Sequence, residues 1–217
     1  MAKKKKYIAK KLIVEGEQDK RVIPEFIEAK GISWGETRDT AIVDIEVYGG
    51  NQFIDSDFIG TELKASGLTN LGLIVDADDN PSGCWTSIRN ACLESIVDFP
   101  EKLPETGLIH ETNAIKFGVW VMPDNQQQGM LETFLGYMIT DENKSIWQYA
   151  QEVVKEAKNR GAAFKNSHFD KANIYTWLAW QDEPGRQLHQ AIKERILNPK
   201  HPKAEMFFNW FKSLYDL

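Results

Sequence analysis

The stretch that decides the fold reads Leu71-Gly72-Leu73-Ile74-Val75-Asp76-Ala77-Asp78-Asp79-Asn80. An apolar run that ends in clustered carboxylates is typical of a β-strand buried on both faces. In an extended chain, residues two apart point to the same side, so Asp76 and Asp78 are expected to converge on one cation. Ligands of open α/β sheets bind just beyond the carboxyl ends of the strands. The stretch therefore predicts a divalent-metal site, and the alternative is an acidic turn that caps the following helix.

Strand and helix signals alternate on both sides of this stretch. Strands are expected at residues 12–14, 41–48, 108–112 and 116–122, and helices at 18–30, 55–66, 85–97 and 130–138. Apolar and acidic residues alternate within 41–48, which places that strand near an edge of the sheet. The alternation of strands and helices predicts an α/β fold with a mainly parallel sheet flanked by helices.

The pattern changes after residue 140, where only helices are expected. Their predicted ranges are 145–159, 173–181, 186–197 and 204–217. We therefore predict two parts, an α/β domain over residues 1–140 and a C-terminal helical extension over residues 141–217 that packs on it.

The composition is that of an ordinary globular protein. The chain has 217 residues, of which 42% are hydrophobic and 27% charged, and its net charge is −6. Residues 1–140 hold 14 Lys and Arg against 22 Asp and Glu, whereas residues 141–217 hold 12 against 10. This asymmetry permits a phosphate-contacting surface beside a metal site without requiring one.

Two further features concern location. No apolar run approaches the roughly 20 residues that cross a bilayer, so no membrane partner is expected. Cys84 and Cys92 lie about two turns apart in one predicted helix, too far to form a disulfide with each other. A reducing cytoplasm is the expected location.

Carboxylates recur at the predicted strand ends. Glu15 ends the first strand, Asp19 follows one helical turn later, and Glu132 opens the helix after the turn at Pro123. With the central aspartates, five carboxylates suit two hard cations roughly 3.5–4 Å apart, an arrangement used for phosphodiester displacement. Oxygen ligands without a Cys or His cluster favour Mg²⁺ or Mn²⁺ over zinc. Taken singly, each acid is an ordinary helix-start residue that the helix dipole favours.

Other catalytic patterns are not supported by their context. Gly31-Ile32-Ser33-Trp34-Gly35 fits the nucleophile motif of serine hydrolases. That motif needs a strand before it and a helix after it, and here the expected order is reversed. No glycine-rich phosphate loop occurs, and the four histidines lack metal-ligand spacing.

Two segments resemble the signatures of Toprim domains, a glutamate after the first strand and Asp-x-Asp after a later one. They are Leu12-Ile13-Val14-Glu15-Gly16-Glu17-Gln18-Asp19 and Leu73-Ile74-Val75-Asp76-Ala77-Asp78. The chain looks similar to an uncharacterised family of small, stand-alone Toprim-like proteins related to the overcoming-lysogenization-defect (OLD) nuclease branch. Members of that family carry segments like residues 118–125, 129–132, 171–181 and 184–186 of this chain.

The resemblance implies a Toprim-like, Rossmann-like sheet and a specific set of functional residues. The acids that match the metal ligands of the family are Glu15, Asp19, Asp76, Asp78 and Glu132. Glu15 also matches a general acid or base, and Lys171 matches a lysine that steadies charge on the scissile phosphate. The alternative for Lys171 is a surface lysine at the start of a helix.

The activity that follows is phosphodiester hydrolysis of nucleic acid with Mg²⁺ or Mn²⁺, by a two-metal mechanism, in phage defence or as a toxin subunit. Lys11, Lys165 and Arg186 are the predicted nucleic-acid contacts, and the basic leader Lys3–Lys6 is either a solvated tail or a phosphate-binding arm. DNA and RNA both remain open as substrates.

Two alternatives come from other classes. One is a non-catalytic subunit that binds nucleic acid or protein and holds a structural or regulatory metal. The other is a nucleotidyl transferase of the primase type, which the short chain without an evident template-handling domain disfavours. The long OLD proteins carry an ATPase that this chain lacks, so a separate ATPase partner is an open expectation, as is a homo-oligomer.

Overall fold

The computed structural model describes residues 9–49 and 54–217, and its centre is a five-stranded sheet. The strands are β1 (Lys10–Val14), β2 (Asp44–Val47), β3 (Asn70–Asp76), β4 (Leu108–Thr112) and β5 (Ile115–Met122). Their spatial order is β2-β1-β3-β5-β4, and only the β4–β5 pair is antiparallel. The predicted α/β fold with a mainly parallel sheet is confirmed, and β2 lies at an edge, as its alternation indicated.

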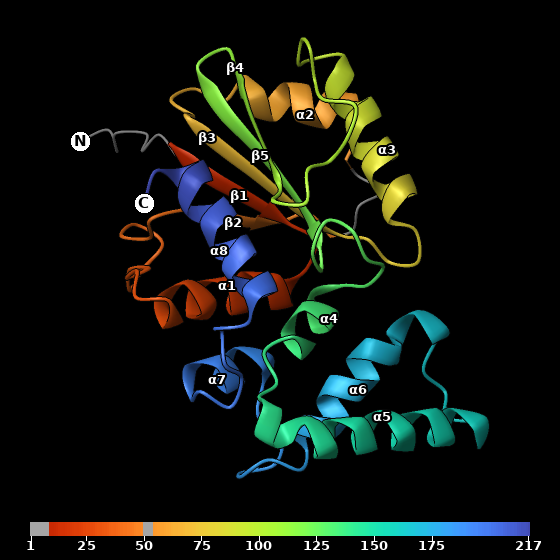
Figure 1. Ribbon diagram of the computed structural model, residues 1–217. Helices are drawn as coiled ribbons and strands as arrows, with labels where there is room; N and C mark the ends of the chain where they lie inside the picture. The colour runs from red at the N-terminus through yellow and green to blue at the C-terminus, as the bar shows by residue number, and fades with distance from the viewer. Residues whose placement is uncertain (1–8, 50–53) are drawn as a thin grey trace.

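Helices cover both faces of this sheet (Figure 1). One face carries α1 (Glu17–Ala29) and α8 (Pro202–Tyr215), and the other carries α2 (Ser56–Leu63) and α3 (Pro81–Leu93). The close approach of α8 depends on two glycines in the central strands. A Cβ at Gly72 would lie 2.3 Å from the Tyr215 hydroxyl, and one at Gly118 would lie 2.6 Å from the Leu214 side chain. The last helix of the chain therefore packs directly on one face of the sheet.

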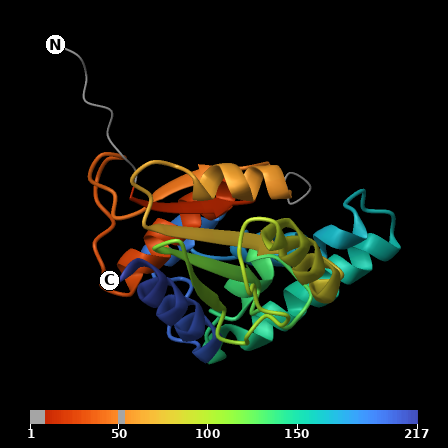
Figure 2. The same ribbon diagram turned by 90° about the horizontal axis from the view of Figure 1, so that it is seen from above.

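The remaining helices lie beyond the carboxyl ends of the parallel strands, as Figures 1 and 2 both show. They are α4 (Leu131–Gly136), the 3₁₀ turn η2 (Asp141–Asn143), α5 (Lys144–Asn159), the 3₁₀ turn η3 (Asn166–His168) and α6 (Phe169–Leu178). α5 packs on α6, α6 packs on α4, and α7 (Leu188–Lys193) packs on α1. The predicted C-terminal helices are confirmed, and they share one hydrophobic core with α1.

The strand order places two functional candidates side by side. β1 pairs with β3 in parallel, with Val14 opposite Ile74, so the residues that follow both strands meet at one edge of the sheet. β3 is buried along its length because it lies in the middle of the sheet with helices on both faces.

Several sequence expectations need correction or lie outside the described residues. α6 begins at Phe169 and not at residue 173, because the 3₁₀ turn η3 leads directly into it. β2 is shorter than predicted, and the basic leader Lys3–Lys6 lies outside the described residues. Cys84 and Cys92 are both free cysteines of α3. Within the described part of the chain, no helix has the length and apolar character of a membrane span.

Candidate functional site

The ends of β1 and β3 join two of the predicted acids. The backbone N–H of Asp76 donates a hydrogen bond to Glu15 Oε2 at 3.2 Å. The Asp76 carboxylate in turn accepts the N–H of Leu131, the first residue of α4, through Oδ1 at 3.1 Å. Residues that follow β1, β3 and β5 are thus held together at the carboxyl edge of the sheet.

Asp19 lies in the first turn of α1 and is nearly inaccessible, with 6% of its surface exposed. Its Oδ2 accepts the N–H of Gly16 at 3.1 Å, which fixes the side chain at the start of the helix. The pKa of Asp19 is raised to about 7, chiefly by burial and also by the charges of Glu132 and Glu15, against the lowering effect of backbone hydrogen bonds. The Asp19 carboxylate is therefore close enough to those of Glu15 and Glu132 to be repelled by both.

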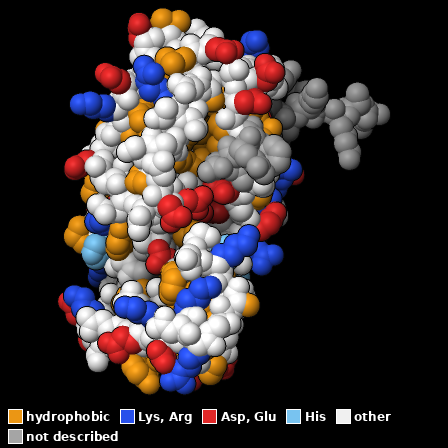
Figure 3. Space-filling view, turned by 90° about the vertical axis from the view of Figure 1, so that its right-hand side faces the viewer, with side chains coloured by type: hydrophobic (Ala, Val, Ile, Leu, Met, Phe, Trp, Pro, Cys, Tyr) orange, Lys and Arg blue, Asp and Glu red, His pale blue; other side chains and the backbone are white. Residues whose placement is uncertain are grey.

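Asp76 is the acid on which these charges converge. Burial raises the pKa of Asp76 well above its usual range, and the charges of Asp19, Glu15 and Glu132 add to that shift. Figure 3 shows acidic side chains gathered near the middle of one face of the molecule, with Lys and Arg side chains below them. The site is short of positive charge.

Glu132 is buried, with 3% of its surface exposed, and it faces α6. The Lys171 Nζ lies 3.3 Å from Glu132 Oε1, while 45% of the Lys171 side chain remains exposed. Burial lowers the pKa of Lys171, but Glu132, Tyr175 and Asp76 together raise it by more, so the net shift is upward and the side chain is a cation at neutral pH. α6 thus supplies a lysine to a buried acid of α4.

Asp78 lies differently from the expectation. Its φ of 48° is left-handed, and its backbone exchanges two hydrogen bonds with Gly129, of 2.9 Å and 2.8 Å. The alternation of an extended strand therefore ends at Asp76 and does not place Asp78 beside it. The side chain is exposed, and burial and Asp79 raise its pKa while His168 lowers it. Asp78 lies at the margin of the site, where its charge still acts on Asp76.

The donor set fits a hard divalent cation by its chemistry. The buried donors are carboxylate oxygens, and burial of carboxylates that repel one another is costly unless a cation or a proton relieves it. In the side-chain arrangement seen here, no three His, Cys, Asp or Glu residues of the described ranges form a ready-made metal group. The acids interact through their charges and are held by backbone N–H groups.

The three predicted nucleic-acid contacts differ in position. Lys165 is exposed and directly precedes η3, on the same extension as Lys171. Lys11 lies toward the opposite end of β1 from Glu15, and its ammonium lies 2.7 Å from Glu46 and 2.8 Å from Glu62.

Arg186 is also engaged, since its guanidinium lies 2.8 Å from Glu183 and 2.6 Å from Glu194. Lys11 and Arg186 thus both form ion pairs, and their contact with nucleic acid stays a prediction.

Four residues of the site are absent from the sequence-based prediction. They are Thr133, His168, Asp170 and Tyr175. The Thr133 hydroxyl donates to Asp170 Oδ2, and burial together with Glu132 raises the pKa of Tyr175. All four depend on the packing of α6 beside α4, for which the sequence holds no local signal.

Comparison with known proteins gives one family and a distant structural likeness. A family model described as "Protein of unknown function (DUF3226)" matches residues 9–216. No match was found among curated proteins.

Two solved structures illustrate the likeness. The C-terminal region of the Burkholderia pseudomallei OLD protein shares 11% identity, covers 97% of this chain and 100% of its own, and gives a TM-score of 0.49. The C-terminal region of the Xanthomonas campestris pv. campestris OLD protein shares 16% identity over 94% of this chain and 84% of its own, with a TM-score of 0.37. At these values the likeness says nothing about the roles of individual residues.

Proposed function

The chain belongs to the family of proteins of unknown function DUF3226, and we propose that its acidic site hydrolyses phosphodiester bonds of nucleic acid with Mg²⁺ or Mn²⁺. One observation carries the proposal. Acids at or after the ends of three different strands lie partly or fully buried near one another, and the pKa of Asp19 and of Asp76 is raised by burial and by mutual repulsion. Acids with raised pKa values cluster at functional sites, and a bound cation would relieve the repulsion between these carboxylates.

The residues that would hold the metal are those of the cluster and its margin. They are Glu15, Asp19, Asp76, Glu132 and Asp78. The chemistry that a hard cation supplies when bound is an acidified water molecule and positive charge beside the phosphate oxygens. The Toprim-like signature in the sequence supports the same assignment for Glu15 and the Asp76–Asp78 pair.

Two further roles, proton transfer and neutralisation of phosphate charge, belong to side chains of the protein. Glu15 is anchored by the Asp76 N–H through one oxygen, which orients its carboxylate to hold or release a proton at the reacting centre. Lys171 is held by Glu132 at one side and is about half exposed, so its ammonium can offset charge on a phosphate that enters from solvent. Lys165, exposed on the same extension, is a contact for the neighbouring phosphates.

The test is a cleavage assay with purified protein on single- and double-stranded DNA and RNA, with Mg²⁺ or Mn²⁺. We expect cleavage that EDTA abolishes and that Glu15→Gln or Asp76→Asn lowers by roughly 10²–10³-fold or more, because each removes a charged group from the reacting centre. Glu17→Gln is the matched control, since Glu17 is an exposed acid in the first turn of α1, close in sequence to Glu15.

Two outcomes would contradict the proposal. Equal activity in the wild type and in both site variants would place the chemistry elsewhere. Salt-dependent nucleic-acid binding without turnover under every condition would favour a binding subunit with a structural or regulatory metal.

A further inference from the structure

Residues 129–133 connect the sheet to the helical extension. Four contacts make this connection: the backbone of Gly129 with Asp78, the Leu131 N–H with Asp76 Oδ1, the Glu132 carboxylate with the Lys171 ammonium, and the Thr133 hydroxyl with Asp170 Oδ2. The first two reach the end of β3, and the last two reach the first turn of α6. The first turn of α4 therefore fixes both walls of the site.

The Thr133 hydroxyl acts both as a hydrogen-bond acceptor and as a donor. It accepts the N–H of Met130 at 3.0 Å, which caps α4, and its own hydrogen points to Asp170. Gly129 makes room for it, because a Cβ there would lie 2.4 Å from Thr133 Oγ1 and the φ of Gly129 is +136°. The loop is thus shaped around this hydroxyl group.

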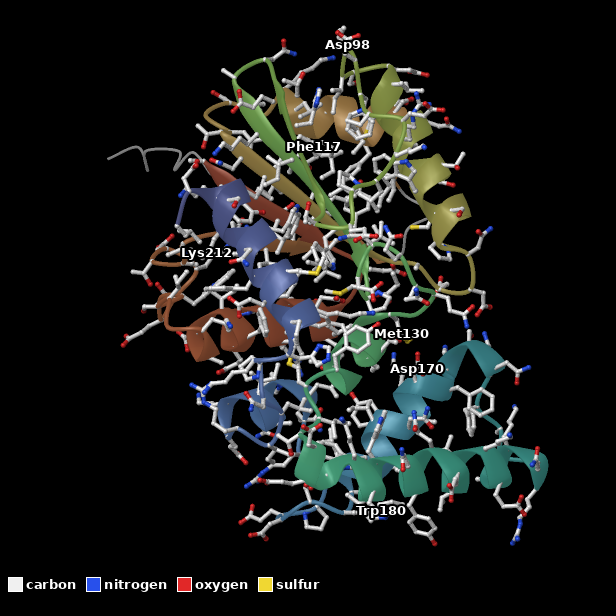
Figure 4. The ribbon with its side chains drawn as sticks, viewed as in Figure 1. Asp98, Phe117, Met130, Asp170, Trp180 and Lys212 are labelled. Carbon is white, nitrogen blue, oxygen red and sulfur yellow. The ribbon has the colours of Figure 1, made fainter. Side chains whose placement is uncertain are left out.

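The contact between Thr133 and Asp170 lies next to the functional ion pair. Glu132 and Thr133 are consecutive in α4, Lys171 and Asp170 are consecutive in α6, and each pairs across the gap. Figure 4 shows Met130 and Asp170 near each other where α4 meets α6. A lysine stem is long and flexible, so the place of its ammonium depends on how α6 is set against α4.

We propose that Thr133 and Asp170 are positioning residues, whose hydrogen bond sets α6 so that the Lys171 ammonium faces Glu132 and the phosphate. The inference rests on the proposed function for the role of Lys171. Asp170 acts as a hydrogen-bond acceptor and not as a cation ligand. Its acceptor oxygen matters for this role, and its charge does not.

Two pairs of variants separate the hydrogen bond from charge and from packing. Asp170→Asn keeps an acceptor oxygen and Asp170→Ala removes it, while Thr133→Ser keeps the hydroxyl and Thr133→Val removes it at equal size. We expect kcat of the Asn and Ser variants within about twofold of wild type. We expect the Ala and Val variants to lose roughly 10–100-fold in kcat, as misplacement of a catalytic group does, with KM nearly unchanged. In a Lys171→Met background, Asp170→Ala should cause no further loss.

A second readout does not depend on activity. The Tm of Asp170→Ala, of Lys171→Met and of the double variant is measured without substrate, and the two shifts are expected to be non-additive because the contacts are coupled. If the wild type cleaves nothing, the proposed function fails, whereas non-additive shifts still support the positioning contact.

Three results would overturn the inference. Asp170→Asn as damaging as Asp170→Ala would show that the charge is what acts. Thr133→Ser as damaging as Thr133→Val would show that the hydroxyl is not what matters. Additive Tm shifts would show that the Thr133–Asp170 contact does not set Lys171.

Discussion

Charged side chains are paired differently at the two ends of the sheet. At the amino end of the parallel strands, Lys11 lies between Glu46 and Glu62, and Lys116 pairs with Asp216. Each of these three acids forms an ion pair with a lysine, and the pKa of Lys11 is raised, since Glu46 and Glu62 together outweigh the lowering effect of burial. This is what an edge needs when its charges serve only the fold.

At the carboxyl end, acids outnumber cations. The acids that interact there are Glu15, Asp19, Asp76 and Glu132, and the Lys171 ammonium contacts one of them, Glu132. At the amino end of the sheet each of the named acids is paired with a lysine. At the carboxyl end the charges of Asp19, Glu15 and Glu132 instead raise the pKa of Asp76. The carboxyl end is therefore the one that we propose as the functional site.

The largest expected effect on stability comes from Asp19. Its pKa is raised from 3.8 to about 7 by burial first and by Glu132 and Glu15 next, so the folded state favours the protonated acid. The stabilisation from that proton is complete below pH 4 and is lost as the pH rises toward 7, because the unfolded state releases the proton earlier. Without metal at pH 8, Asp19→Asn should raise the free energy of unfolding by roughly 2–4 kcal/mol and flatten its dependence on pH between 4 and 7.

Urea unfolding in EDTA at several pH values measures this effect. Glu17→Gln, an exposed acid two residues away, is the control and should leave the pH dependence as it is. If the free energy of unfolding of Asp19→Asn depends on pH as that of the wild type does, repulsion between the acids does not destabilise the fold.

A smaller effect with the opposite sign is expected at the amino end. Lys11→Met removes the partner of Glu62, whose side chain is only 14% exposed, and should lower the free energy of unfolding by roughly 1–3 kcal/mol. Nucleic-acid affinity should not change, because Lys11 is not at the site. If Lys11→Met loses nucleic-acid affinity without losing stability, Lys11 is a substrate contact.

The smallest effect is expected at Lys116 and Asp216. This pair is exposed, and exposed ion pairs contribute little because solvent and salt screen them. Lys116→Met should give no resolvable change in Tm in moderate salt. A clear loss of stability would mean that the amino end depends on its ion pairs more than the comparison implies.

The sequence predicts the sheet and most of its acids because both have local signals. The apolar run before Asp76 shows a buried central strand, and the spacing of Glu15 and Asp19 follows from a helix that begins promptly. Asp78 shows where that reasoning ends. Its left-handed backbone is fixed by Gly129, which lies 51 residues later in the chain.

The residues contributed by the helical extension have no such signals. Thr133 and Asp170 resemble ordinary helix-start residues, and their contact exists only because α6 packs on α4. Lys11 and Arg186 look like free cations in the sequence, whereas their acidic partners appear only after folding. The sequence does not predict which charged residues pair once the chain has folded.

Isothermal titration of Mn²⁺ at pH 8, where Asp19 is ionised in the absence of metal, tests whether the acidic end holds a cation. We predict saturable binding to the wild type, weakened roughly tenfold or more by Asp76→Asn and unchanged in Glu17→Gln and Lys11→Met. Binding that is absent in the wild type, or equal in Asp76→Asn and the wild type, would contradict the account.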